Sequence, residues 1–191
     1  CLRDEDEIAV LEMGISDFGE MTRLAKIAKP DTCVITNIGT CHLENLGDRD
    51  GVLKAKTEIF KYVKKNIVLN GDDDKLSTVK EYNGIQPVFF GNGENASVTC
   101  ENVESRGLKG MSCDICLKGK MAENGEFQKF HVEIPMPGRH MVSNALAAAA
   151  IGRLYGLNAE QIKNGIESLE PVSGRFNMIE TDKFLIVDDC Y

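Results

Sequence analysis

The chain has 191 residues, of which 42% are apolar, a length and composition that suit one domain with a buried core. The net charge of −8 argues against a general nucleic-acid surface, which needs clustered Lys and Arg, and no apolar run approaches the roughly 20 residues that cross a bilayer. Seven cysteines, an odd number spread through apolar segments, indicate reduced thiols and a cytoplasmic location rather than a disulfide framework.

The first third of the chain alternates predicted strands and helices. Ile8 to Leu11 and Thr32 to Thr36 are short apolar runs that predict strands. Phe18 to Ala28 has helical spacing, and Pro30 marks its end. A second helix is predicted from Asp50 to Val63, followed by a strand at Asn66 to Leu69. This βαβαβ order predicts a parallel, right-handed sheet.

Lys56 lies on the apolar side of the predicted second helix. The i, i+3, i+4, i+7 rule places it on one stripe with Val52, Ile59, Phe60 and Val63. An unpaired ammonium group on an apolar face is costly. We therefore expect Lys56 to snorkel, to find an anion, to lose its proton or to be covalently changed.

The pattern changes between Gln86 and Ile134 to short β-rich runs separated by Gly-containing turns. This pattern predicts an antiparallel meander within a single domain that spans residues 1–191. Its predicted strands are Val88 to Phe90, Ser97 to Val103, Ser112 to Leu117 and Phe127 to Ile134.

The last part of the chain returns to helices. An alanine-rich helix is predicted from Val142 to Tyr155, and Gly156 marks its end. A further helix is predicted from Ala159, followed by a pair of strands near Phe176 to Ile179 and Phe184 to Val187. The fold class expected from the whole pattern is α/β, with a mostly parallel sheet flanked by helices.

Polar side chains follow the predicted strands at the point where each one ends. Because ligands gather at the carboxyl ends of parallel strands, these oxygen-rich groups could hold a hard cation and a nucleotide. The residues concerned are Glu12 after the first strand, Asn37 and His42 after the second, Asn70 and Asp72 after the third, and Asp188 and Asp189 after the last.

Some of these residues also have simpler interpretations. Asn70 and Asp72 fit turn chemistry equally well, and the run from Asp72 to Asp74 fits a solvated helix start. Gly14 lets another backbone or a ligand approach Glu12, which favours a functional role for that carboxylate.

Seven motifs in order along the chain resemble the central ATP-binding domain of the Mur ligases, and most of all the members that add D-alanyl-D-alanine. The motifs are EMG at 12–14, GEMTRLAKIAKPD at 19–31, TNIGTCHLENLG at 36–47, KAKTEIF at 54–60, PGRHMVSNALAAAA at 137–150, SGRF at 173–176 and the terminal DDCY. The resemblance spans nearly the whole chain.

The resemblance implies an ATP-dependent ligase of peptidoglycan precursor synthesis. In such an enzyme a carboxylate of UDP-N-acetylmuramoyl-tripeptide is phosphorylated by ATP, and the amine of D-alanyl-D-alanine then opens the acyl phosphate. The resemblance also implies magnesium ions held by Glu12, His42 and a carbamylated Lys56. A carbamate would turn the buried cation into an anionic oxygen ligand.

The same resemblance implies a set of nucleotide contacts. Asn144 matches an adenine-contacting asparagine, Arg175 matches an arginine that reaches the phosphates, and Asp189 matches the acid that holds the ribose. Asn37, at a strand end, is also expected on the nucleotide side. Met141 departs from the family pattern, because it stands where GRHN usually has its asparagine.

A phosphate loop of the form GxxxxGK[ST] is missing from the sequence. In the family this loop and the first strand of the sheet precede the EMG motif, so we expect the chain to be part of a longer, monomeric enzyme and to be inactive alone. Two other classes stay open. One is a folylpolyglutamate synthase or another Mur ligase, and the other is a non-catalytic module that resembles a nucleotide-binding domain.

Overall fold

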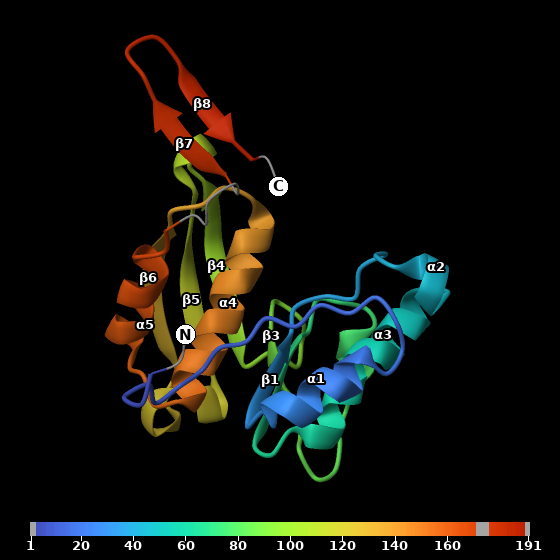
Figure 1. Ribbon diagram of the computed structural model, residues 1–191. Coiled ribbons are helices and arrows are strands. Elements are labelled where there is room, and N and C mark those ends of the chain that lie inside the picture. Colours follow the sequence, from blue (N-terminus) through green and yellow to red (C-terminus); the bar gives the residue numbers. More distant parts are fainter. Residues whose placement is uncertain (1–2, 171–175, 190–191) are drawn as a thin grey trace.

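The computed structural model describes residues 3–170 and 176–189, and a six-stranded sheet is its centre (Figure 1). The strands follow one another across the sheet in sequence order. The first four are mutually parallel, whereas β5 is antiparallel to both β4 and β6. The strands are β1 (Thr32–Ile35), β2 (Asn66–Asn70), β3 (Val88–Phe90), β4 (Val98–Ser105), β5 (Met111–Leu117) and β6 (Gln128–Ile134).

Helices pack on both faces of this sheet. Along β2, Ile67 and Leu69 are buried with the helices that precede that strand, and Val68 is buried with the two C-terminal helices, as the alternation of side chains in a strand requires. The helices are α1 (Glu20–Ala28), α2 (Leu43–Leu46), α3 (Arg49–Thr57), α4 (Arg139–Leu154) and α5 (Ala159–Glu167), and α3 continues into the 3₁₀ helix η1 (Glu58–Tyr62).

The predicted α/β class and most predicted elements are confirmed. The helix expected at Asp50 to Val63 is α3 with η1, and its stripe of Val52, Ile59, Phe60 and Val63 is buried. Among the residues described, no helix has both the length and the apolar character needed to cross a membrane. All five cysteines in this part of the chain are free thiols, as expected.

The prediction of a strand at Ile8 to Leu11 is wrong. This run has no strand pairing within the described part of the chain, and its side chains are exposed, Val10 at 90%. A strand exists only where a neighbour completes its hydrogen bonds, and apolar character alone does not supply that neighbour.

The antiparallel meander starts later than expected. β3, the first strand of the region from Gln86 to Ile134, pairs in parallel with β2, and its single paired residue with β4, Phe90 opposite Val98, is also parallel. Within residues 86–134, the strands that pair antiparallel are β4, β5 and β6, which continue the same sheet.

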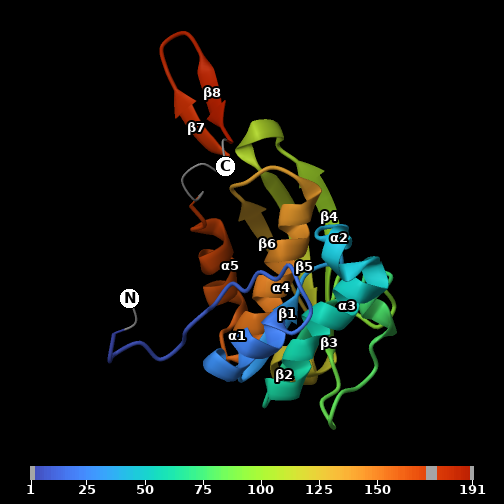
Figure 2. The same ribbon diagram turned by 45° about the vertical axis from the view of Figure 1, so that its right-hand side comes forward.

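The last two strands form where expected but belong to a separate sheet. β7 (Asn177–Glu180) and β8 (Leu185–Asp188) make an antiparallel hairpin that projects from the rest of the molecule (Figures 1 and 2). The expectation that Asp188 and Asp189 end a strand of the main sheet is therefore wrong.

The amino end of α4 points toward the carboxyl ends of the parallel strands. The hydroxyl of Tyr155, just after α4, lies 3.1 Å from Oγ1 of Thr32 at the start of β1. Because the carboxyl end of α4 is next to the amino end of β1, the amino end of α4 points toward the side of the sheet at which β1 and β2 end. The candidate site lies at these carboxyl ends.

Candidate functional site

A small pocket of about 60 Å³ forms between the loop that follows β1 and helix α3. Three predicted site residues, Asn37, His42 and Lys56, line this pocket. The first two come from the loop and the third from the helix, so the structure joins residues that are up to 19 positions apart. The remaining lining residues are Ile15, Gly39, Cys41, Leu46 and Val52.

Lys56 is half-buried, and its amine is directed at the loop. Nζ donates a hydrogen bond to the main-chain oxygen of Asn37 at 2.9 Å. Burial lowers the pKa of Lys56 below its usual value. Within the described residues no carboxylate forms an ion pair with this amine. Glu58, two residues along the chain, accepts hydrogen bonds from Gly19 and Thr22 instead.

His42 reaches the pocket through an unusual backbone conformation. Its φ of 58° and ψ of 30° lie in the left-handed region, which is uncommon for residues other than glycine but less so for His. The residue caps the amino end of α2, and its exposed imidazole Nδ1 lies 3.9 Å from Oε1 of Glu44. The ring therefore makes only a long contact with Glu44 and remains accessible at the rim of the pocket.

The side chains of Asn70 and Asp72 form hydrogen bonds that connect the ends of β1, β2 and β3. Asn70 Nδ2 donates to the Thr36 oxygen at 2.9 Å, and Asn70 Oδ1 accepts from the Asp72 amide at 2.9 Å. Asp72 Oδ1 accepts from the Asn92 amide, beyond β3, at 2.7 Å. Both side chains thus have the turn chemistry that the sequence allowed, and they join the loops beside the pocket.

Asp73 is a residue of this edge that the sequence analysis missed. Its side chain is only 8% exposed, and Oδ2 accepts a hydrogen bond from the Ile38 amide at 2.8 Å. The solvated-run interpretation is therefore wrong for this residue. Its position three residues beyond the end of β2, where β1 also finishes, was the only signal in the sequence.

The structure does not bring the predicted site residue Glu12 into the pocket. Glu12 is exposed and is not among the lining residues. A Cβ atom at Gly14 would meet no heavy atom within 4 Å, so no described group uses the close approach that this glycine permits.

Of the residues expected at the nucleotide, Asn144 and Asp189 lie away from the pocket that Asn37 lines. Asn144 is exposed on α4, with Nδ2 3.7 Å from the Met141 sulfur. Asp189 accepts a hydrogen bond from the Phe176 amide at 3.0 Å, beside the hairpin. Arg175 lies outside the described residues.

The side chains of the pocket can be compared with the magnesium site that the resemblance implies. Within residues 3–170 and 176–189, no group of three His, Cys, Asp or Glu side chains is arranged to hold a metal. His42 offers one ligand, and a carbamate on Lys56 would add anionic oxygens beside it. The residues present therefore fit a magnesium site only in its modified form and only in part.

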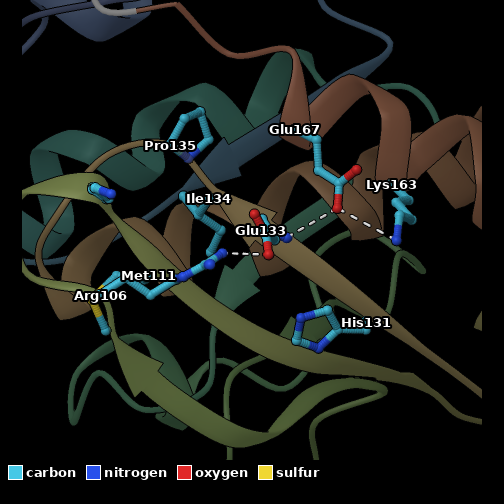
Figure 3. Close-up of a pocket in the computed structure, with 9 residues that line it drawn as sticks. Arg106, Met111, His131, Glu133, Ile134, Pro135, Lys163 and Glu167 are labelled. Carbon is cyan, nitrogen blue, oxygen red and sulfur yellow. Dashed lines mark hydrogen bonds and ion pairs between the residues drawn. The ribbon is translucent and has the colours of Figure 1, made fainter.

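A larger pocket, of about 380 Å³, lies by the far edge of the sheet, between β5, β6 and α5 (Figure 3). None of the predicted site residues lines it. Arg106 pairs with Glu133, and Lys163 pairs with Glu167 (Figure 3). Nζ of Lys163 is 3.5 Å from Oε1 of Glu167. The charges in these two pairs neutralise each other, and Lys109, which also lines the pocket, leaves one positive side chain in excess.

Comparison with known proteins identifies the family. The model of the Mur ligase middle domain matches residues 1–152. The UDP-N-acetylmuramoyl-tripeptide–D-alanyl-D-alanine ligase of Bacillus subtilis is 36% identical over 192 aligned residues, which include all of this chain and 39% of that protein.

Solved structures agree with this match. MurF from Acinetobacter baumannii superimposes with a TM-score of 0.83 and 32% identity, over all of this chain and 40% of that one. MurF from Thermotoga maritima, solved with ADP, gives 0.71 and 28%, over 92% of this chain and 39% of that one. The chain thus spans about two fifths of the length of these relatives. The chain therefore belongs to the Mur ligase family, with residues 1–152 matching its middle domain.

Proposed function

We propose that this chain is the central part of an ATP-dependent ligase that adds D-alanyl-D-alanine to UDP-N-acetylmuramoyl-tripeptide. The observation that carries the proposal is the pocket in which the Lys56 amine, the Asn37 carbonyl and His42 meet at the end of β1. Its support is the likeness, along the whole chain, to relatives that bear this ligase name.

The chemistry starts from the family's use of ATP and Mg²⁺. Bound ATP supplies the phosphoryl group that activates the substrate carboxylate as an acyl phosphate, which the amine of D-alanyl-D-alanine opens to form the new amide. We assign Asn144, Arg175 and Asp189 to the nucleotide side of this reaction, as the resemblance implies, and Asn37 because it follows a strand of the sheet.

Lys56 acts after modification. Its neutral amine forms an N–C bond to CO₂ and releases one proton to solvent, which leaves a carbamate with one negative charge. Burial favours this step because it lowers the pKa of Lys56 and so raises the fraction of neutral amine. The carbamate would then supply hard oxygen ligands for magnesium next to the His42 imidazole. We assign Glu12 to the same ion from the resemblance, although its carboxylate does not line the pocket.

The test is substrate-dependent phosphate release by the longer protein. We expect Lys56→Ala and His42→Ala to lower kcat by about 100-fold, because each removes a ligand of the catalytic metal. Lys61→Ala is the matched control, since Lys61 is an exposed lysine of η1 that does not line the pocket. Residues 1–191 alone are expected to show no turnover.

The choice of substrates separates the alternatives. Turnover with D-alanyl-D-alanine supports the proposal. Turnover only with a single amino acid or with a folate would indicate another Mur ligase or a folylpolyglutamate synthase. A longer protein that releases no phosphate with any of these substrates would be a non-catalytic module.

A further inference from the structure

Both main-chain polar atoms of Ile38 are held by charged side chains from other elements. The amide donates to Asp73 Oδ2 at 2.8 Å, and the carbonyl accepts from Arg49 Nε at 2.9 Å. The preceding residue, Asn37, is the one whose carbonyl accepts from the Lys56 amine at 2.9 Å. The Ile38 amide and the Asn37 carbonyl belong to the same peptide group, so the contact with Asp73 directly constrains the contact with Lys56.

The two side chains that hold Ile38 are themselves well fixed. Besides Ile38, Asp73 accepts through Oδ1 from the amides of Lys75 and Leu76, at 3.0 and 2.9 Å. Arg49 pairs through its guanidinium with Asp74, and its Nη2 lies 3.7 Å from Asp73 Oδ2. Charge-assisted hydrogen bonds of this kind are stronger than neutral ones and fix geometry.

Burial makes this arrangement rigid. The Ile38 side chain is 2% exposed and Leu76 is fully buried, both in the cluster that includes Val52 of α3. The loop after β1, the turn after β2 and the start of α3 are thus joined through one carboxylate and one guanidinium. A shift of this carboxylate would move the Asn37 carbonyl relative to α3.

We propose that Asp73 and Arg49 are positioning residues for Lys56: by holding Ile38 they fix the Asn37 carbonyl, and that carbonyl sets where the Lys56 amine, and the carbamate formed on it, can lie. The inference about the carbamate rests on the proposed function. The inference about the amine stands on the geometry of the chain itself.

Two substitutions break the contacts without removing the side chains. In Asp73→Asn, the amide oxygen can still accept from Lys75 and Leu76, but the NH₂ group that replaces Oδ2 cannot accept from Ile38. In Arg49→Lys, the charge is retained and the Nε donor is lost. Asp50→Asn is the matched control. Asp50 is exposed and pairs with Lys75, and its substitution removes the same charge as Asp73→Asn.

Two measurements on the 191-residue protein report the state of Lys56: how much of it is carbamylated and how accessible its amine is. The first is the ¹³C NMR carbamate signal in ¹³C-bicarbonate with Mg²⁺, assigned by its loss in Lys56→Arg. The second is labelling of Lys56 by trace acetic anhydride, relative to the exposed Lys64 and quantified by peptide mass spectrometry. Thermal unfolding midpoints identify any variant that does not fold. If Asp73→Asn does not fold, the measurements on Arg49→Lys decide the test.

We expect the carbamate population to fall about tenfold in Asp73→Asn and Arg49→Lys, in line with the loss that follows when the partner of a metal ligand is removed. Lys56 labelling should rise about threefold, because the released loop exposes the amine. Asp50→Asn should leave both values at the wild-type level.

Labelling of Lys56 that stays at the wild-type value in both variants would overturn the positioning role, whatever the carbamate does. A wild-type chain that forms no carbamate in saturating bicarbonate would count against the proposed modification alone. In that case the labelling ratios still decide whether Asp73 and Arg49 position the amine, so the two failures are distinguishable.

Discussion

Asp114 on β5 carries a pKa shift whose consequence can be measured. Asn102 Nδ2 donates to its carboxylate at 2.8 Å, His131 Nδ1 lies 2.9 Å away and Lys129 Nζ lies 3.3 Å away. The hydrogen bond from Asn102, followed by those from His131 and Lys129, lowers the pKa of Asp114 from 3.8 to about 2. The ionised form is thus favoured in the folded state.

A lowered carboxylate pKa stabilises the fold above the unfolded value and loses that effect as pH falls through the folded value. For Asp114 the loss falls between about pH 4 and pH 2. We predict that Asp114→Asn flattens the decline in the free energy of unfolding over this window, as measured by urea titrations at several pH values. Glu126→Gln, at an exposed site, should leave the wild-type slope. An unchanged slope in Asp114→Asn would show that these contacts do not favour the ionised form.

At the level of single residues, the site was predictable where the signal was local. The stripe on α3 is a property of neighbouring positions, so the inward direction of Lys56 followed from spacing alone. Asp73 was missed because its bond to Ile38 joins residues 35 positions apart. The placement of Glu12 depended on a strand that the described residues do not form.

At the level of elements, α5 has a complete capping box. Asn158 Oδ1 accepts from the main-chain amide of Gln161 at 2.9 Å, and Gln161 Oε1 accepts from the main-chain amide of Asn158 at 3.0 Å. We predict that Asn158→Ala lowers the free energy of unfolding by about 1 kcal/mol, because it leaves a first-turn amide unpaired.

Asn164→Ala is the control for that prediction, since it changes the same residue type at an exposed position inside the same helix. It should have no effect or be slightly stabilising, because alanine has the higher helix propensity. Urea unfolding of the two variants side by side measures the difference. Equal losses in both would mean that the cap contributes nothing beyond propensity.

Element types and boundaries followed closely from the sequence, but pairing directions did not. A short run such as β3 shows apolar character without showing which neighbour it will pair with or in which sense. The long connection at residues 71–87 lets the chain cross back so that β3 runs parallel to β2, whereas the short connection at residues 106–110 turns β5 back antiparallel to β4. The hairpin of β7 and β8 was recognised as two strands, but its separation from the main sheet is a tertiary property.

At the level of the whole molecule, one sheet divides two hydrophobic clusters. Leu146 of α4 is 2% exposed in the cluster on one face, and Leu76 is fully buried in the cluster on the other. β2 contributes to both clusters through alternate side chains. Loss of packing on either face therefore weakens the strand that the other face also needs.

We predict that Leu146→Ala and Leu76→Ala each lower the free energy of unfolding by about 2–5 kcal/mol, the usual cost of such a cavity, and that unfolding remains a single transition. The two losses should add in the double variant, because the sites lie on opposite faces.

Hydrogen exchange of peptides from β1 and from β5, followed through a urea titration, should report one midpoint for both. Leu108→Ala, at a side chain that is 45% exposed, should cost less than about 1 kcal/mol. Separate midpoints for β1 and β5 would mean that the parallel and antiparallel halves of the sheet fold as independent units.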